Sequence, residues 1–211
     1  MKFATITSAA LLASALSAAV PASAAIITLD FEGVGDLIPV GSFYAALGVE
    51  FSPATLAIVD SDAGGSGNIA NEPSGDTVMF FLDANNAILN FAAGFKTGFS
   101  FFYATSVNAV VSVWDGLDGT GNLLGSINII RNIGGPGDPT GSYATWDIGG
   151  IAFAGTAKSI DFGGTANFTG YDDITFGSAT PVPPIPLPAA LPLLLGALAV
   201  LGTLRRRRRA V

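Results

Sequence analysis

The chain has 211 residues, contains neither cysteine nor histidine, and carries a formal net charge of −7. These absences exclude disulfides, thiolate metal sites, Ser-His-Asp triads and His-ligated zinc or iron. Residues 25–178 hold three basic and sixteen acidic residues, a net charge of −13, which disfavours binding to nucleic acid or to an anionic membrane surface.

Residues 1–24 have the pattern of a signal peptide. Lys2 supplies a positive charge, an Ala- and Leu-rich apolar stretch follows, and Ala22 and Ala24 fit the A-x-A rule of signal peptidase. We therefore expect signal peptidase to cut after Ala24, or one residue later, and the rest of the chain to be exported.

Residues 25–178 predict a single all-β domain. Apolar and polar residues alternate most clearly over 25–32, as they do in a strand with one buried face. Further runs rich in β-branched and aromatic residues are expected to be strands at 48–52, 55–59, 77–81, 97–103, 108–115, 122–130, 143–148, 157–162 and 171–177. Turn residues recur about every 8–12 positions, which predicts a jelly-roll-like β-sandwich with loops at 60–75 and 132–141.

Acidic residues at the two ends of this domain form the first candidate site. Asp30 and Glu32 belong to the first predicted strand, and Asp172 and Asp173 lie at the entry of the last one. If these two strands are neighbours, the carboxylates repel each other unless a cation lies between them, and calcium binds through oxygen ligands alone. The alternative is that all four are solvated edge charges.

Two tryptophans form the second candidate site, for a carbohydrate. Trp114 and Trp146 are each followed by an acid, Asp115 and Asp147, and an aromatic ring beside a hydrogen-bonding carboxylate suits sugar recognition. The alternative is that both indoles belong to the core, as we expect for the aromatic row in 97–103. No pair of carboxylates is singled out by its spacing, so we expect no enzyme, although carboxylate-only glycoside hydrolysis stays open.

The C-terminal region divides into a Pro-rich linker at 179–188, an apolar stretch at 189–204 and a basic tail at 205–211. The 16 apolar residues would span about 24 Å as a helix, short of the about 30 Å core of a bilayer. A basic flank stays in the cytoplasm, so the tail predicts a membrane helix with the domain outside. The topology-determining residues are Arg205, Arg206, Arg207, Arg208 and Arg209.

This order of proline motif, apolar helix and arginine cluster resembles the VPLPA variant of the PEP-CTERM sorting signals, with Ile185 in place of the valine. The resemblance implies recognition by an exosortase, a membrane protease of Gram-negative bacteria that cuts near the motif. By the same resemblance, the recognised residues are Pro186, Leu187, Pro188 and Ala189.

The domain itself is similar to the sandwich domains that such proteins carry, which open on a strand like 29–33 and close on one like 171–176. That similarity implies a non-catalytic cell-surface or extracellular-matrix protein that associates with extracellular polysaccharide. Signal peptidase and exosortase are the partners expected during export, with a transient inner-membrane anchor. The alternatives are a purely structural surface protein and a carboxylate-only glycoside hydrolase.

Overall fold

The computed structural model describes residues 26–133, 142–164 and 166–182, and strands dominate this part of the chain. Its helical element is a single 3-10 turn, η1 (Ala45–Leu47). The strands are β1 (Ile27–Leu29), β2 (Val49–Phe51), β3 (Thr55–Val59), β4 (Thr77–Phe81), β5 (Ile88–Thr105), β6 (Ala109–Trp114), β7 (Leu123–Ile129), β8 (Asp147–Asp161) and β9 (Thr169–Phe176). The expectation of an all-β domain is confirmed.

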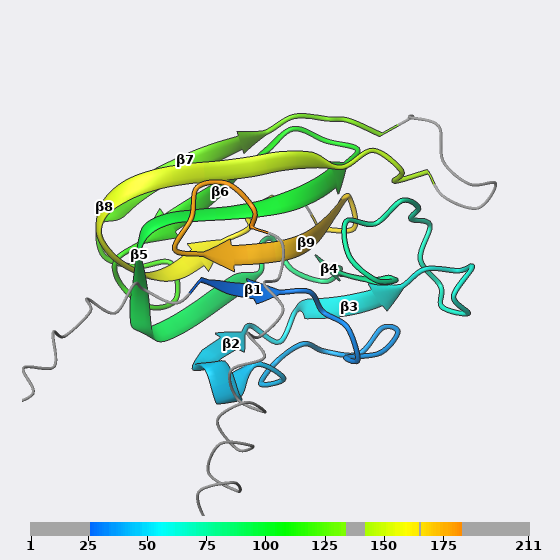
Figure 1. Cartoon of the computed structure of the whole chain (residues 1–211), viewed down its shortest axis with the longest axis horizontal. Coiled ribbons are helices and arrows are strands. Elements are labelled where there is room, and N and C mark those ends of the chain that lie inside the picture. Colours follow the sequence, from blue (N-terminus) through cyan, green and yellow to red (C-terminus); the bar gives the residue numbers. More distant parts are fainter. Residues whose placement is uncertain (1–25, 134–141, 165, 183–211) are drawn as a thin grey trace, which may run out of the picture.

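One hydrogen-bonded sheet contains all nine strands, in the order β3-β4-β9-β5-β8-β6-β7, with β1 added on β9 and β2 on β5. The first part of β5 pairs with β2 and with the end of β8, whereas its second part pairs with β9 and the start of β8. Register shifts mark the point between these two parts, where β5 and β8 bend together (Figure 1).

This bend doubles the sheet over into two layers that enclose an aromatic core. Phe162, which follows β8, packs against Phe99 and Phe101 of β5 and against Tyr171 of β9, with ring centroids 4.8–6.3 Å apart. The predicted core row is confirmed, because Phe99 and Phe101 are fully buried and Tyr103 is 6% exposed. The layered all-β arrangement is therefore established, while its description as jelly-roll-like stays a prediction.

The structure differs from the predicted strand boundaries mainly in β5 and β8. Residues 88–96 were not expected to be strand, and the separate strands predicted at 143–148 and 157–162 are replaced by one continuous strand, β8. Predicted strands 55–59 and 77–81 are confirmed, and the predicted loop at 60–75 contains no named strand.

The predicted signal peptide at 1–24 and the sequence beyond Val182 lie outside the described residues. The predicted sorting residues Pro186, Leu187, Pro188 and Ala189 and the arginines at 205–209 therefore lie outside them too. Within residues 26–133, 142–164 and 166–182, the structure contains no helix that could span a bilayer.

Candidate functional site

A pocket on the outer face of the β9–β5 layer contains Trp146, one of the two tryptophans that were predicted to bind a carbohydrate. Trp146 lines it together with Phe102, and both rings are partly exposed. The cavity measures about 420 Å³, within the range of small-ligand sites. Its remaining lining residues are Asn71, Pro73, Ser74, Asp173, Pro181 and Val182. Aromatic rings and polar side chains thus share one pocket, a combination that suits a ligand with both apolar faces and hydrogen-bonding groups.

The orientation of Trp146 is fixed by the loop at 60–75. Its indole Nε1 donates a hydrogen bond to the carbonyl oxygen of Ala70 at 3.0 Å, and Asn71 Nδ2 donates to the carbonyl oxygen of Ala144 at 3.2 Å. Ile69 also forms a parallel bridge with Tyr143. Because the N–H group of the indole is already bonded, the ring faces are what Trp146 offers to a ligand.

A β-bulge in β9 places Asp173 in this pocket. Ser100 pairs with Thr175 and Phe102 with Asp172, so two residues of β9 lie opposite the single Phe101 of β5. Asp173 is the irregular position, with a left-handed φ of 47°, a conformation that aspartate tolerates better than most residues. The bulge therefore turns an additional carboxylate toward the ligand pocket.

Asp173 is 8% exposed, and its Oδ1 atom finds no hydrogen-bond partner within the described ranges. Burial raises the pKa of this carboxyl, a hydrogen bond from Ser74 opposes the increase, and the negative charge of Asp30 adds to it. A buried acceptor without a partner costs free energy, and a donor from a ligand hydroxyl would remove that cost. Asp173 is therefore suited to accept a hydrogen bond from a bound sugar.

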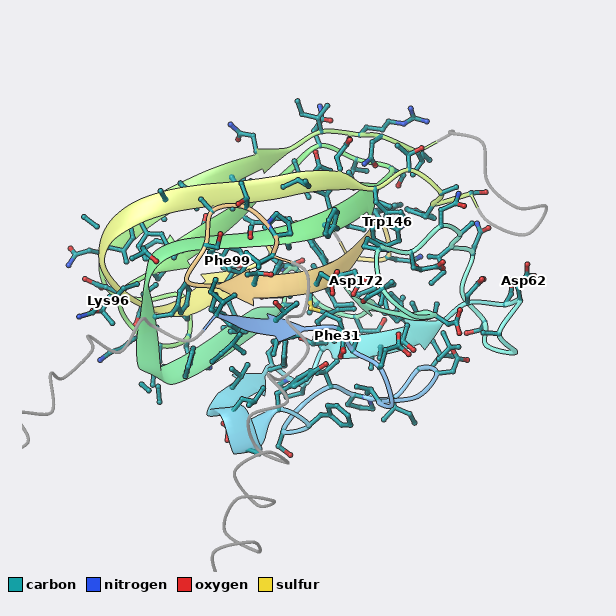
Figure 2. All side chains as sticks on the ribbon, viewed as in Figure 1. Phe31, Asp62, Lys96, Phe99, Trp146 and Asp172 are labelled. Atoms are coloured by element: carbon teal, nitrogen blue, oxygen red, sulfur yellow. The ribbon has the colours of Figure 1, made fainter. Side chains whose placement is uncertain are left out.

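The adjacent Asp172, labelled in Figure 2, is enclosed by protein groups and is not open to a ligand. It is fully buried and accepts hydrogen bonds from the Ser74 amide at 3.0 Å, the Ser74 hydroxyl at 3.1 Å and the Asp173 amide at 2.7 Å. Burial, and after it the charge of Asp173, raise the pKa of Asp172 to about 8. The expectation that Asp172 and Asp173 lie at the entry of the strand was wrong, because β9 begins at Thr169 and includes both.

The first and last strands are neighbours, as the calcium hypothesis requires. β1 pairs with β9 through Leu29 and Ile174, so Asp30 follows directly beside Asp173. Glu32 has a different role: its carboxylate accepts hydrogen bonds from the amides of Asp76 at 3.0 Å and Thr77 at 2.8 Å. Among the described residues, no group of three or more acidic side chains is arranged to hold a metal ion.

Calcium binding by Asp30, Asp172 and Asp173 thus stays a prediction, and it has a direct test. A cation between these carboxylates would offset their mutual repulsion, so calcium is expected to raise the melting temperature at pH 8, where a large fraction of Asp172 is ionised. In the variant Asp173→Ala, calcium should leave the melting temperature unchanged. Identical melting curves of the unmodified protein in calcium and in EDTA would contradict the hypothesis.

The other predicted carbohydrate residues, Trp114 and Asp115, lie away from Trp146. Trp114 ends β6 and pairs with Ser159, near the far end of β8, whereas Trp146 immediately precedes that strand. Asp115 accepts hydrogen bonds from the Asn122 side chain at 2.9 Å and its amide at 2.7 Å, which lower its pKa. These bonds make Asp115 the closing residue of a turn, so the structure does not bring the two tryptophans into one site.

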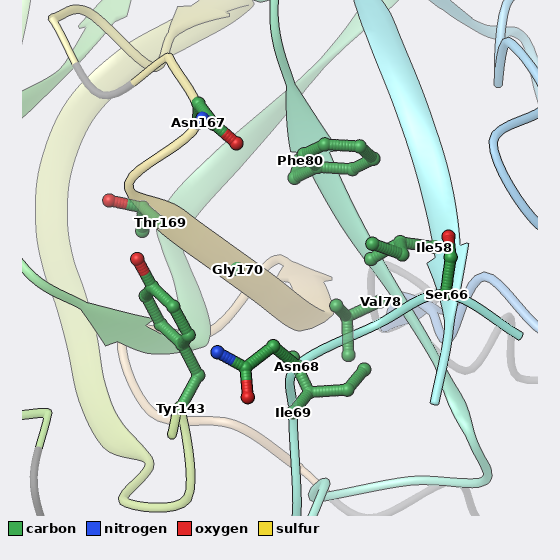
Figure 3. A pocket seen from close by; sticks show the side chains of 10 residues that line it. All are labelled: Ile58, Ser66, Asn68, Ile69, Val78, Phe80, Tyr143, Asn167, Thr169 and Gly170. Atoms are coloured by element: carbon green, nitrogen blue, oxygen red, sulfur yellow. The ribbon is translucent and has the colours of Figure 1, made fainter. Parts of the chain in front are cut away.

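A second pocket lies next to Gly170, and no pattern in the sequence predicted it. It measures about 350 Å³ and is shown in Figure 3. Gly170 lines this second pocket and lies against the Trp146 ring of the first one, so that a Cβ atom there would lie 3.2 Å from the indole. The lining residues are Ile58, Ser66, Asn68, Ile69, Val78, Phe80, Tyr143, Asn167, Thr169 and Gly170. Strands β3, β4 and β9 and the loop at 60–75 all contribute residues to this second pocket.

Comparisons with known proteins found no matching family model and no matching curated protein. Among solved structures, the chain is similar to a family 6 carbohydrate-binding module, with 18% identity over 73% of this chain and 93% of the module and a TM-score of 0.39. It is also similar to such a module from Clostridium stercorarium in complex with cellobiose, with 16% identity, 71% and 92% coverage and a TM-score of 0.40. A third similar structure is a carbohydrate-binding module from Cellvibrio mixtus lichenase 5A in complex with cellotriose. Its sequence identity is 15% over 59% of this chain and 87% of the module, with a TM-score of 0.37. At these values, the likeness does not place the chain in that family.

Proposed function

We propose that this protein is a non-catalytic, exported surface protein whose β-sandwich, of jelly-roll-like type, binds a neutral extracellular polysaccharide. The observation that carries the proposal is the pocket formed by Trp146, Phe102 and Asp173. A sugar ring stacks its apolar face on the indole while its hydroxyl groups hydrogen-bond to Asp173 and to the amide of Asn71. The net charge of −13 between residues 25 and 178 favours a neutral glycan over an anionic one.

The carboxylates of the pocket support binding rather than hydrolysis. Glycoside hydrolases use two carboxyl groups on opposite sides of the scissile bond. Asp173 is the one acidic side chain among the described residues that line this pocket, whereas Asp172 is fully buried against Ser74. This arrangement provides a hydrogen-bond acceptor without a second catalytic group.

Affinity electrophoresis in gels that contain hydroxyethylcellulose, xylan or mixed-linkage β-glucan tests the proposal. The protein is expected to be retarded by at least one of these neutral polymers, and alginate, which is anionic, serves as the control. Unchanged mobility in all three neutral gels would contradict the proposed function.

We propose further that the chain reaches the cell surface by the route that its two ends predict. Signal peptidase removes residues 1–24, the stretch at 189–204 holds the protein in the inner membrane, and an exosortase then cuts near Pro186. The PEP-CTERM resemblance of the tail supports this route. Mass spectrometry of the surface protein is expected to show a new C-terminus near 185–189, and a chain intact through Val211 would contradict it.

A further inference from the structure

The segment that follows β9 folds back over the domain instead of leaving it. We call residues 177–182 the linker strap. Its start is anchored on β5, because the Gly177 amide donates to the Gly98 carbonyl oxygen at 2.9 Å and Thr97 Oγ1 donates to the Gly177 carbonyl oxygen at 2.7 Å. A turn formed by Ser178, whose Oγ donates to the Thr180 carbonyl oxygen at 2.6 Å, then directs the chain back (Figure 1).

Two glycines of the sheet make room for the strap. A Cβ atom at Gly98 would lie 2.5 Å from the Ala179 nitrogen, and one at Gly150 would collide with the Ala179 carbonyl oxygen. Ser100 lies between these positions and is fully buried, although its side chain belongs to the outer face with Phe102. The backbone of the strap therefore rests directly on β5 and β8, in a groove that exists because Gly98 and Gly150 have no side chain.

The end of the strap reaches the candidate ligand pocket. Pro181 and Val182 line that pocket together with Trp146, Phe102 and Asp173. The cavity of about 420 Å³ thus remains open while the strap lies in place, so the strap is a wall of the pocket and not an occupant of it. Pro181 and Val182 present apolar atoms, which pack well against the C–H face of a sugar ring.

We infer that the linker strap is a part of the glycan-binding site, and that Pro181 and Val182 help to determine which glycan fits. This inference rests on the proposed function, because it assigns a further wall to the same pocket. Because the ligand contacts both the sheet and the strap, glycan binding and docking of the strap stabilise each other. The polypeptide that leads to the sorting motif is therefore coupled to the occupancy of the pocket.

Two sets of variants of the full-length chain test the inference. Gly150→Ala is designed to lift the strap, and Gly163→Ala is its control because a Cβ atom there makes only ordinary contacts, at 3.5 Å or more. Pro181→Gly combined with Val182→Gly removes the wall itself without touching the sheet. Pro53→Gly is the matched control, since Pro53 is exposed, lies outside the strap and does not line the pocket.

Affinity for hydroxyethylcellulose, xylan and mixed-linkage β-glucan is expected to fall roughly tenfold in Gly150→Ala and in the double variant, and to stay unchanged in both controls. Hydrogen exchange provides a second readout. The peptide covering 177–182 should exchange faster in Gly150→Ala without ligand, and more slowly in the unmodified protein when the bound polymer is present.

The outcomes separate the strap from the proposed function. If Trp146→Ala loses binding while the double variant binds as the unmodified protein does, the strap inference is overturned and the proposed function stands. If the unmodified protein binds none of the three polymers, both are overturned. Because the double variant changes only the strap, a failure to fold of Gly150→Ala does not remove the test.

Discussion

Trp146→Ala is expected to lower the affinity of the protein for the neutral polysaccharide that we propose as its ligand at least 30-fold, a loss of roughly 2 kcal/mol. The indole is partly exposed, lines the pocket and has its N–H group bonded to Ala70, so its faces are available for stacking. Removing it eliminates the largest apolar surface that the pocket can offer to a sugar ring.

Three further variants show whether this loss belongs to the site. Trp146→Phe keeps an aromatic face but not the hydrogen bond to Ala70, and should bind with intermediate affinity. Trp114→Ala, at the opposite end of β8, should bind as the unmodified protein does. Phe43→Ala removes an exposed aromatic ring that does not line the pocket, so it controls for a general loss of surface hydrophobicity.

Affinity electrophoresis and isothermal titration with the retarding polymer measure these effects, and thermal melting verifies that each variant is folded. Full binding by Trp146→Ala would contradict the assignment of the pocket. A loss of binding confined to Trp114→Ala would instead move the site to the turn that Asp115 closes.

The sequence predicted which residues face the core wherever a strand kept its regular alternation. Phe99, Phe101 and Tyr103 are buried as expected, and Leu29 and Ile174 meet where the first and last strands pair. Alternation depends only on the pleat of a strand, so it can be read without knowing the tertiary partners.

Glycine is the reason that β8 could not be predicted as one strand. Gly149 and Gly150 are typical turn residues, yet both lie inside β8. A Cβ atom at Gly149 would lie 2.6 Å from the ring of Phe101, and one at Gly150 would collide with Ala179. Here glycine marks the close approach of a ring and of a second segment, and both neighbours are distant in sequence.

The candidate site was predictable only in part, for a similar reason. Trp146 was identified from its neighbouring acid, but its partners come from the loop at 60–75, from β5 and from the linker strap. The position of Asp173 depends on a bulge whose register is set by pairing with β5. Spacing along the chain carries no information about such a register shift.

Asp172→Asn is expected to stabilise the protein at pH 8 and above, and to remove a large part of the pH dependence of its stability. The pKa of Asp172 is raised to about 8 in the folded protein, mainly by burial, whereas an unfolded aspartate titrates near 4. The stability that this group contributes is therefore fully present below about pH 4. It decreases as the pH rises and is lost above about pH 8.

Within that window, the free energy of unfolding should fall by up to about 1.4 kcal/mol per pH unit, several kcal/mol in total. Asparagine carries no charge, but its Nδ2 cannot accept one of the two amide hydrogen bonds, from Ser74 or from Asp173, that the carboxyl oxygens accept. The variant should therefore be about 1–3 kcal/mol less stable than the unmodified protein near pH 4 and exceed it at pH 8. The gain comes from removing the charge that would otherwise be buried beside Asp173.

Urea unfolding at intervals from pH 4 to pH 9 in EDTA measures both proteins without interference from calcium. Asp83→Asn, at an exposed carboxyl, controls for the change in net charge. Parallel pH profiles for Asp172→Asn and the unmodified protein would contradict the prediction, because they would mean that Asp172 has the same pKa in the folded and the unfolded protein.

Calcium can be added to the same experiment. If calcium restores the stability of the unmodified protein at pH 8 and has no effect on Asp172→Asn, the ion and the buried charge act at one place. That result would link the calcium hypothesis to the wall of the candidate ligand pocket, since Ser74 contacts Asp172 and lines that pocket.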